Sequence, residues 1–271
     1  MKDKKILIIG GTGAVGRTLV ERYHSSNEII VLSRDEHKHY HLQKEYPNVH
    51  SIIGDVKDKS SIKNCLLRFK PHIVVNAAAL KHVPICEDDP FESVKTNIMG
   101  HQNIIESVNE VGNIETLIFV STDKACNPIN VYGMCKSISE RLYVEYAKQR
   151  GTPKVVLVRY GNVLYSTGSV LCKWKKLLQE GKEVIVTAPE ATRYFWSINQ
   201  AIDLIFDCME NATTPDPYVP DMKSMKVIDL LHAMASKYLK EGADLKIKEI
   251  YVKWKGYNSN FNQWIPETNL Q

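Results

Sequence analysis

The sequence lacks the features that mark a membrane, secreted or nucleic-acid-binding protein. It has no apolar run near the ~20 residues that a membrane-spanning helix needs. Its six cysteines form neither CxxC pairs nor the short spacings of a disulfide framework. The formal charge is only +4, with Lys and Arg spread among Asp and Glu, so we expect no nucleic-acid partner. The first residues lead directly into a strand-like run, so we expect no signal peptide and a reducing, cytoplasmic location.

The sequence does contain hydrophobic residues, and they occur in a regular order. Hydrophobic residues make up 44% of its 271 positions, enough for a large buried core. Short runs rich in Ile and Val alternate with longer amphipathic segments, and such continuous runs are typical of strands covered on both faces. We expect strands over 4–10, 28–33, 49–54, 72–78, 115–121 and 154–160, and helices over 14–24, 60–69, 91–111 and 132–150.

This alternation predicts an α/β fold. Six strands separated by helices, with a glycine-rich first turn, indicate a doubly wound parallel sheet of the NAD(P)-binding Rossmann type over residues 1–160. The ligand of such a sheet lies at the carboxyl ends of its strands. The alternation weakens after Tyr160, so we expect residues 161–248 to form a smaller C-terminal substrate-binding part.

The first turn reads ILIIGGTGAVGR over residues 6–17, in which Gly10, Gly13 and Gly16 form a GxxGxxG pattern. Such glycines allow a tight turn, the approach of a pyrophosphate and the start of a helix whose N-terminus faces the anion. The alternative is a strand-to-helix turn with incidental glycines.

The end of the second strand indicates which dinucleotide would bind. A dinucleotide fold normally places an acid there, on the ribose 2′-hydroxyl, but this sequence has Ser33 and Arg34 first. A hydroxyl and a guanidinium suit a 2′-phosphate, which an acid would repel. We therefore predict NADP as cofactor. Asp35 follows directly and keeps NAD open, and Arg34 as an ordinary surface residue is a further alternative.

A tyrosine and a lysine mark the candidate chemistry. Tyr132 and Lys136 are four residues apart in YGMCK, so both project from one face of a predicted helix. A tyrosine with a pKa near ~10 is a poor base at neutral pH, and a nearby ammonium group stabilises its phenolate. The pair follows the fifth predicted strand and the stretch STDK at residues 121–124.

Several stretches together carry a family resemblance: GGTGAVGR, SRDE, GDVKD, NAAALKHVPICEDDP, TNIMGHQN, STDKACNPINVYGMCK, VRYGNV and GSV. With them the chain resembles the extended short-chain dehydrogenase/reductase superfamily. Within it, the chain is similar to the UDP-N-acetylglucosamine 4,6-dehydratases that invert C5, of the polysaccharide biosynthesis type. The subgroup is indicated by Lys124, because the C5-retaining hexose dehydratases carry Asp-Glu where this sequence has Asp123-Lys124.

The resemblance implies an NADP-dependent lyase acting on a UDP-sugar. Tyr132 would take the proton of the sugar 4-hydroxyl while Lys136 holds the phenolate and the cofactor ribose. Lys124 would then remove the C5 proton and Asp123 would protonate the departing 6-hydroxyl, leaving a 6-deoxy-4-keto sugar. An exposed loop pair is the alternative for Asp123 and Lys124.

The resemblance also assigns binding positions. Those facing the cofactor are Gly10, Thr12, Gly13, Ala14, Val15, Gly16, Ser33, Arg34, Asp55, Val56, Ala77, Ala79, Lys81, Asn97, Tyr132 and Lys136. Those near the nucleotide sugar are Lys81, Asn162, Ser169, Val170, Thr187 and Arg193, with Arg193 on the diphosphate. We expect no metal site. We expect the chain to form a homo-oligomer. His37, His39, His41 and His101 show no ligand pattern, and we expect polar surface there.

Two departures from the family affect the second half. Tyr165 and Thr167 in YSTGSV replace the Gly and Arg of the usual GSRGSV, which puts the identity of the sugar in question. The family's motif RPGEKxHE, which helps close the substrate domain, is absent, and this puts the activity in question. In place of that motif, the tail 249–271 resembles the second half of a chromodomain, with Trp254 and Tyr257 at two cage positions. A piece of about 22 residues cannot form its own core, so we expect it to pack on the sugar-binding part instead of reading methyl-lysine.

Two other functions remain open. A UDP-sugar 4-epimerase or 4-reductase would share Tyr132 and Lys136 without needing Asp123 and Lys124. From another class, the chain could be a catalytically weakened binding protein that uses its chromodomain-like tail to contact a partner.

Overall fold

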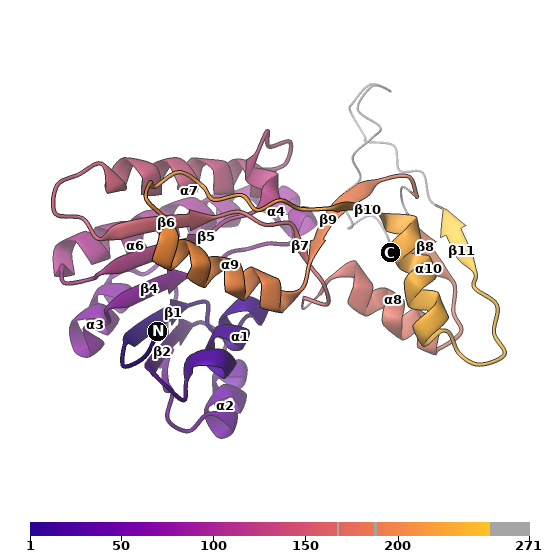
Figure 1. Cartoon of the computed structure of the whole chain (residues 1–271), viewed down its shortest axis with the longest axis horizontal. Helices are drawn as coiled ribbons and strands as arrows, with labels where there is room; N and C mark the ends of the chain where they lie inside the picture. Colours follow the sequence, from indigo (N-terminus) through magenta and orange to yellow (C-terminus); the bar gives the residue numbers. More distant parts are fainter. Residues whose placement is uncertain (167, 187–188, 250–271) are drawn as a thin grey trace. The chain divides into compact units, whose positions relative to one another are not determined.

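The computed structural model describes residues 1–166, 168–186 and 189–249 (Figure 1). The chain forms two compact units. The first contains Met1–Tyr160 and Ile198–Pro220, and the second contains Gly161–Ser197 and the described residues from Asp221 onward. Thr167, Thr187 and the tail with Trp254 and Tyr257 lie outside the described residues.

The first unit is built on a six-stranded parallel sheet in the order β3-β2-β1-β4-β5-β6. Its strands are β1 (Lys5–Ile9), β2 (Glu28–Ser33), β3 (His50–Ile53), β4 (Ile73–Asn76), β5 (Thr116–Val120) and β6 (Lys154–Val158). The order reverses beside β1, as expected for a doubly wound sheet. The α/β prediction is confirmed, because apolar runs such as ILII and TLIFV are buried from both sides.

Helices flank this sheet (Figure 1). They are α1 (Ala14–Tyr23), α2 (Glu36–Glu45), α3 (Lys59–Phe69), α4 (Val83–Asp88), α5 (Pro90–Val94), the π-helix η1 (Lys95–Met99), α6 (Gly100–Val111), the 3₁₀ turn η2 (Asp123–Ala125), α7 (Val131–Ala147) and α9 (Ile198–Asn211). Helix α2 was not predicted, because its sequence EHKHYHLQKE buries only His39 and Leu42 and so shows no apolar period. The single helix expected over 91–111 is divided among α5, η1 and α6.

One core cluster lies between the sheet and the helices α3, α6 and α7. Leu7, Leu32 and Leu66 are fully buried in it. Phe119 of β5 stacks on Tyr143 of α7 with ring centroids 4.5 Å apart and planes 4° from parallel. This packing holds α7, the helix that carries Tyr132 and Lys136, against the end of β5.

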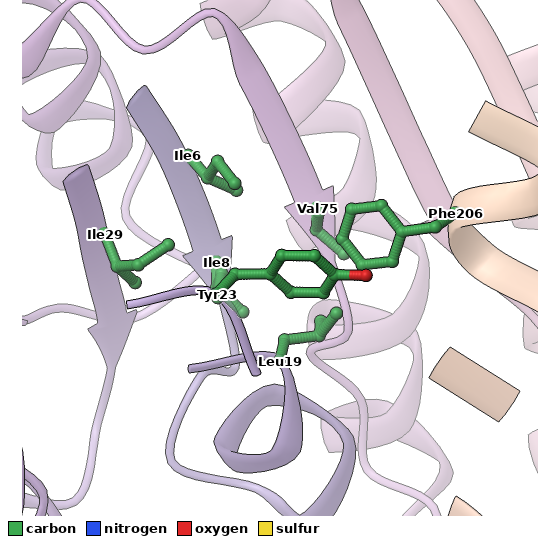
Figure 2. A pocket seen from close by; sticks show the side chains of 7 residues that line it. All are labelled: Ile6, Ile8, Leu19, Tyr23, Ile29, Val75 and Phe206. Atoms are coloured by element: carbon green, nitrogen blue, oxygen red, sulfur yellow. The ribbon is translucent and has the colours of Figure 1, made fainter. Parts of the chain in front are cut away.

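A second apolar seam joins α1, α9 and the sheet. Figure 2 shows the side chains that meet there, which are Ile6, Ile8, Leu19, Tyr23, Ile29, Val75 and Phe206. The rings of Tyr23 and Phe206 have centroids only 4.0 Å apart, and the backbone nitrogen of Arg159 donates to the carbonyl of Tyr218 at 2.8 Å. Residues Ile198–Pro220 therefore belong to the first unit. They were predicted to be part of the substrate-binding part, residues 161–248.

The second unit contains a three-stranded sheet in the order β10-β9-β7 and a pair β11-β8. Its elements are β7 (Asn162–Val163), α8 (Val170–Gln179), β8 (Val184–Val186), β9 (Thr192–Trp196), β10 (Ser224–Lys226), α10 (Val227–Tyr238) and β11 (Ile247–Glu249). Leu171, Trp174 and Leu231 form part of its own buried core. In the described ranges, no helix is long and apolar enough to cross a membrane.

Candidate active site

The glycine loop between β1 and α1 forms an open cradle. Gly10 adopts φ +83°, and a Cβ atom there would lie 2.8 Å from the backbone nitrogen of Ala78. Gly13 is the N-cap of α1, and its Cβ would meet only the carbonyl of Gly10, at 3.3 Å. Because Gly13 has no side chain, it leaves the first amides of α1 uncapped, with Ala14 and Val15 at the helix start. A diphosphate fits such a cradle, since free amides and the helix dipole favour an anion.

At the end of β2, the two charged residues have different roles. Asp35 is the N-cap of α2 and accepts a hydrogen bond from the backbone nitrogen of Lys38 at 3.1 Å. That backbone hydrogen bond, with the Lys38 side chain, lowers the pKa of Asp35. The Arg34 side chain is 50% exposed, with Nη1 4.0 Å from the carboxylate of Asp55. Asp35 is therefore engaged by its helix, whereas Arg34 has freedom to meet a ligand.

Two histidines that we expected at the surface are buried, and that expectation is wrong for both. His39 is 4% exposed because α2 packs it against the ends of β2 and β3, where Nε2 lies 2.8 Å from the Ser33 hydroxyl. His101 is fully buried on α6, and Nε2 lies 3.1 Å from the carbonyl oxygen of Ala78. Burial lowers the pKa of His101 to about 3. His37 and His41 are exposed, and no group of three metal-ligating side chains occurs among the residues that the structure describes.

The loop after β4 is held by an asparagine on the π-helix. The side chain of Asn97 accepts from the backbone nitrogen of Leu80 and donates to its carbonyl, both at 2.8 Å. Ser139 of α7 donates to the carbonyl of Asn97. This fixes the half-buried alanines Ala77 and Ala79 beside β1, while Lys81 is exposed. Asn97 thus supports the loop through its amide, and π-helical turns are frequent at functional sites.

Lys136 is buried at the end of β5. Its side chain is 2% exposed, and Nζ donates to the carbonyl oxygen of Val120 at 2.7 Å and lies 4.2 Å from the ring centroid of Phe119. Burial lowers the pKa of Lys136 to about 7, and the negative charge of Glu140 opposes that shift. The group is thus poised to change its charge near neutral pH.

Tyr132 begins the same helix and is 9% exposed. Burial raises the pKa of its hydroxyl, while a hydrogen bond with the side chain of Thr122 lowers it and the charge of Asp123 raises it. Asn130 caps the helix by accepting from the backbone nitrogen of Gly133 at 2.8 Å. Tyr132 therefore meets the loop that follows β5.

That loop carries a compact polar group. Thr122 Oγ1 donates to Asp123 Oδ1 at 2.9 Å, and Lys124 Nζ donates to the same oxygen at 3.2 Å. The side chains of Lys124 and Asp123 are 29% and 19% exposed, so they are not an exposed loop pair. From the motif STDK only Asp123 and Lys124 were predicted to belong to the site, and Thr122 was not. The hydroxyl one residue before the Asp-Lys pair was the available signal.

A buried ion pair behind this loop was also missed. Glu140 lies one turn after Lys136 on α7, and its carboxylate accepts from Ser121 and from Nε of Arg159 at 2.8 Å. Nη2 of Arg159 donates to the other carboxylate oxygen. Ser121 begins the loop and Arg159 follows β6, so Glu140 ties three segments together. Its signals were a glutamate at helical spacing and the arginine of VRYGNV.

The second unit holds most of the residues expected near the sugar. Asn162 pairs with Phe195 in the parallel β7-β9 ladder. Ser169 and Val170 occupy the N-cap and first position of α8. Arg193 lies on β9, where Nη1 donates to the carbonyl of Thr192 at 2.8 Å. Thr187 lies outside the described residues.

A doubly wound sheet with an open glycine cradle, a buried Tyr-Lys pair on one helix and a hydroxyl beside the tyrosine defines a short-chain dehydrogenase/reductase. The chain belongs to the family described as polysaccharide biosynthesis protein, whose pattern matches residues 6–256. This places it among the nucleotide-sugar dehydratases and epimerases of that superfamily.

Three similar proteins illustrate this placement. The chain is 40% identical over 241 residues to a UDP-N-acetylglucosamine 4,6-dehydratase (inverting) of Campylobacter jejuni, covering 86% of this chain and 71% of that protein. The structure of Pen from Bacillus thuringiensis is 32% identical with a TM-score of 0.85, covering 92% of this chain and 80% of the other. The dTDP-glucose 4,6-dehydratase DesIV of Streptomyces venezuelae, solved with NAD bound, has a TM-score of 0.81 over 91% of this chain and 84% of its own. At 17% identity, DesIV shows a likeness of fold alone.

Proposed function

We propose that the chain is an NADP-dependent UDP-N-acetylglucosamine 4,6-dehydratase that inverts C5 and releases a 6-deoxy-4-keto sugar for glycan synthesis. The observation that carries the proposal is the hydrogen-bonded group of Thr122, Asp123 and Lys124 next to Tyr132. The 40% identical inverting dehydratase supports the choice of reaction and substrate.

The residues of the first unit fit a dinucleotide. The cradle at Gly13 leaves room and free amides for a diphosphate. The exposed guanidinium of Arg34 suits a 2′-phosphate, while the carboxylate of Asp35 is occupied by the N-terminus of α2. When bound, the cofactor would accept a hydride from C4 of the sugar and return it to C6.

Tyr132 would act as the base toward the sugar 4-hydroxyl. Its phenolate must be stabilised, because burial raises the pKa of Tyr132 above its ordinary value. Thr122 would support the phenolate by turning its hydroxyl proton from Asp123 to Tyr132. The ammonium form of Lys136 would support it by charge. A phenolate charge in turn favours the protonated form of Lys136, whose pKa is about 7 without it.

Asp123 and Lys124 would carry out the elimination as a pair. Lys124 must be neutral to take the C5 proton, and Asp123 must be protonated to release the 6-hydroxyl as water. Their atoms are joined by a hydrogen bond of 3.2 Å, so one proton passing from Lys124 to Asp123 produces both required forms. After the elimination Lys124 is again an ammonium and Asp123 again a carboxylate, so the pair regains its starting charges. Hydride return to C6 is accompanied by one proton added to C5 from the opposite face, which equals in number the 4-hydroxyl proton that Tyr132 took.

The nucleotide sugar would be held by residues of the second unit. We propose Arg193 for the diphosphate, because a guanidinium pairs with phosphate oxygens in a bidentate manner. Asn162, Ser169, Val170, Thr187 and Lys81 complete the proposed substrate positions. Tyr165 replaces the family's glycine and adopts φ +55°, so the loop before α8 keeps a backbone conformation that suits glycine.

We also propose that the chain forms a homo-oligomer in the cytoplasm. The adjoining elements α4, α5, η1 and α7 expose large apolar side chains, including Ile85, Phe91 at 80%, Met99 and Met134. Apolar surface of this kind favours contact with a second copy. Light scattering of the purified chain measures its mass in solution, and a monomer at micromolar concentration would contradict the proposal.

One experiment separates the candidate functions. The protein is incubated with UDP-N-acetylglucosamine in heavy water and followed by proton NMR. A dehydratase replaces the C6 hydroxymethyl signals with a C6 methyl signal and introduces deuterium at C5. A 4-epimerase changes only the C4 stereochemistry and keeps the C5 proton, and a 4-reductase leaves this substrate unchanged. No turnover with capture of methyl-lysine peptides would instead support a binding protein.

A further inference from the structure

A chain of hydrogen bonds runs through the wall beside the glycine loop. Thr12 Oγ1 lies 2.9 Å from Ser33 Oγ, and Ser33 Oγ lies 2.8 Å from His39 Nε2. On the other side of the imidazole, His39 Nδ1 is hydrogen-bonded to Ser51 Oγ. The chain thus links four elements, because Thr12 belongs to the glycine loop, Ser33 to β2, His39 to α2 and Ser51 to β3. Only His39 is buried below one-tenth exposure, at 4%.

The partners of His39 determine where its proton lies. Nε2 is also 3.0 Å from the backbone carbonyl oxygen of Ser33, which can only accept. Nε2 therefore carries the hydrogen and donates to the carbonyl and the hydroxyl of Ser33. Nδ1 is then the acceptor, and Ser51 donates to it. Burial lowers the pKa of His39, which favours this neutral tautomer.

In this arrangement, one hydroxyl proton of Ser33 and Thr12 has no acceptor within the network. Ser33 and Thr12 have two hydroxyl protons between them, and their mutual hydrogen bond uses one, whichever of the two donates. The His39 N–H already occupies one acceptor position of the Ser33 oxygen. The pair thus presents one O–H donor outside the network, and an acceptor-only group such as a phosphate matches it.

We propose that His39 is a positioning residue that fixes Ser33 and Thr12 as a hydrogen-bond donor to the 2′-phosphate of NADP. The inference rests on the NADP preference proposed above and names the group that enforces it. Arg34 supplies the charge, while the neutral imidazole sets the direction of the hydroxyls. A phosphate oxygen, which is charged and can only accept, gains more from this fixed O–H donor than a ribose hydroxyl, which accepts as a neutral group.

The test compares nucleotides with and without the 2′-phosphate. Calorimetry on the full chain, freed of copurified nucleotide, measures Kd for NADP, NAD, 2′,5′-ADP and 5′-ADP. The variants are His39→Leu, which removes the N–H donor, and His39→Gln, whose amide nitrogen can donate from the place of Nε2. Ser51→Ala is the matched control, because it alters only the far end of the chain. Ser33→Ala removes the hydroxyl itself and keeps the test open if His39→Leu fails to fold.

The expected result is selective. His39→Leu and Ser33→Ala weaken NADP and 2′,5′-ADP by about tenfold, as for one lost hydrogen bond to a charged group, and leave NAD and 5′-ADP nearly unchanged. His39→Gln and Ser51→Ala keep the wild-type ratio. If His39→Leu weakens NADP and NAD equally, or keeps a wild-type preference for NADP, the positioning role is overturned and the cofactor proposal stands. If the wild type binds NADP and NAD equally, both proposals are overturned.

Discussion

A Cβ atom on Gly133 would lie 2.3 Å from the backbone carbonyl oxygen of Lys124. The two residues belong to the two segments that carry the proposed chemistry, α7 and the loop after β5. Because glycine follows Tyr132 directly, the first turn of α7 can pack against that loop. A side chain here would have to displace backbone, which is costly in a packed site.

Gly133→Ala is therefore expected to lower kcat by about 100-fold, the scale of a 1 Å misplacement of catalytic groups. It should also lower the melting temperature. Arg141→Ala is the control, because Arg141 lies on the same helix and is exposed. Steady-state kinetics and thermal melts of both variants test this. Wild-type turnover by Gly133→Ala would show that the loop and the helix can separate without loss.

Lys136 should make stability depend on pH. Its pKa is lowered by burial to about 7 in the folded chain, from the ordinary value of 10.5. Between these values the unfolded chain binds more protons than the folded one, so the free energy of unfolding rises with pH. Urea unfolding from pH 6.5 to 9 is compared for wild type and Lys136→Met. The stability difference between them, wild type minus variant, should grow with pH.

Lys148→Met serves as the control for that measurement, because Lys148 ends the same helix and its side chain is 64% exposed. It should leave the pH dependence of the wild type unchanged. A stability difference between wild type and Lys136→Met that stays constant across this range would contradict the lowered pKa.

Lys124→Ala should block dehydration more than C4 oxidation. Removing a general base slows its own step by about 10²- to 10⁴-fold, while Tyr132 still takes the 4-hydroxyl proton. In single turnovers, the absorbance of reduced nicotinamide should therefore rise and persist in Lys124→Ala. Tyr132→Phe should instead slow the rise itself. Dehydration by Lys124→Ala at the wild-type rate would show that another group removes the C5 proton.

Arg34→Ala should narrow the preference for NADP over NAD, by about tenfold for the loss of one charge-assisted contact. Asp35→Ala is the matched comparison, because its carboxylate caps α2 through the backbone nitrogen of Lys38. It should lower the melting temperature and leave the preference unchanged. Calorimetric titration with both nucleotides distinguishes the two effects. A changed preference in Asp35→Ala would reassign the recognition to the carboxylate.

Glu140→Gln should alter both stability and the pH dependence of turnover. The charge of Glu140 raises the pKa of Lys136 and pairs with the guanidinium of Arg159. Without it, Lys136 loses its proton at lower pH, so the alkaline limb of the pH–kcat profile should move to lower pH. Glu140→Asp keeps the charge and should move the limb less. An unmoved limb in Glu140→Gln would leave Glu140 with a structural role alone.

Local patterns in the sequence predicted much of the sheet. Runs such as EIIVLS and TLIFV are buried on both faces of the sheet, and their continuous apolar composition is the pattern that predicts such strands. The helix α2 was missed because its polar sequence contacts the sheet through two residues, His39 and Leu42. The break of the predicted helix 91–111 at η1 was also missed. Asn97 in η1 is hydrogen-bonded to Leu80, which lies 17 residues away in the sequence, so no local pattern indicates this contact.

The residues of the candidate site can be divided in the same way, into features that the sequence predicts and features that only the structure shows. The sequence by itself determined what depends on neighbours along the chain: the glycine turn, the Tyr132-Lys136 spacing on one helix face, and the adjacent Asp123 and Lys124. Only the tertiary structure decided which of these groups are buried and what they contact. His39 was a surface residue by pattern, and it became the partner of Ser33 and Ser51 because α2 folds back onto β2 and β3. Burial and hydrogen bonds between distant segments set proton positions and pKa values, and no local spacing contains that information.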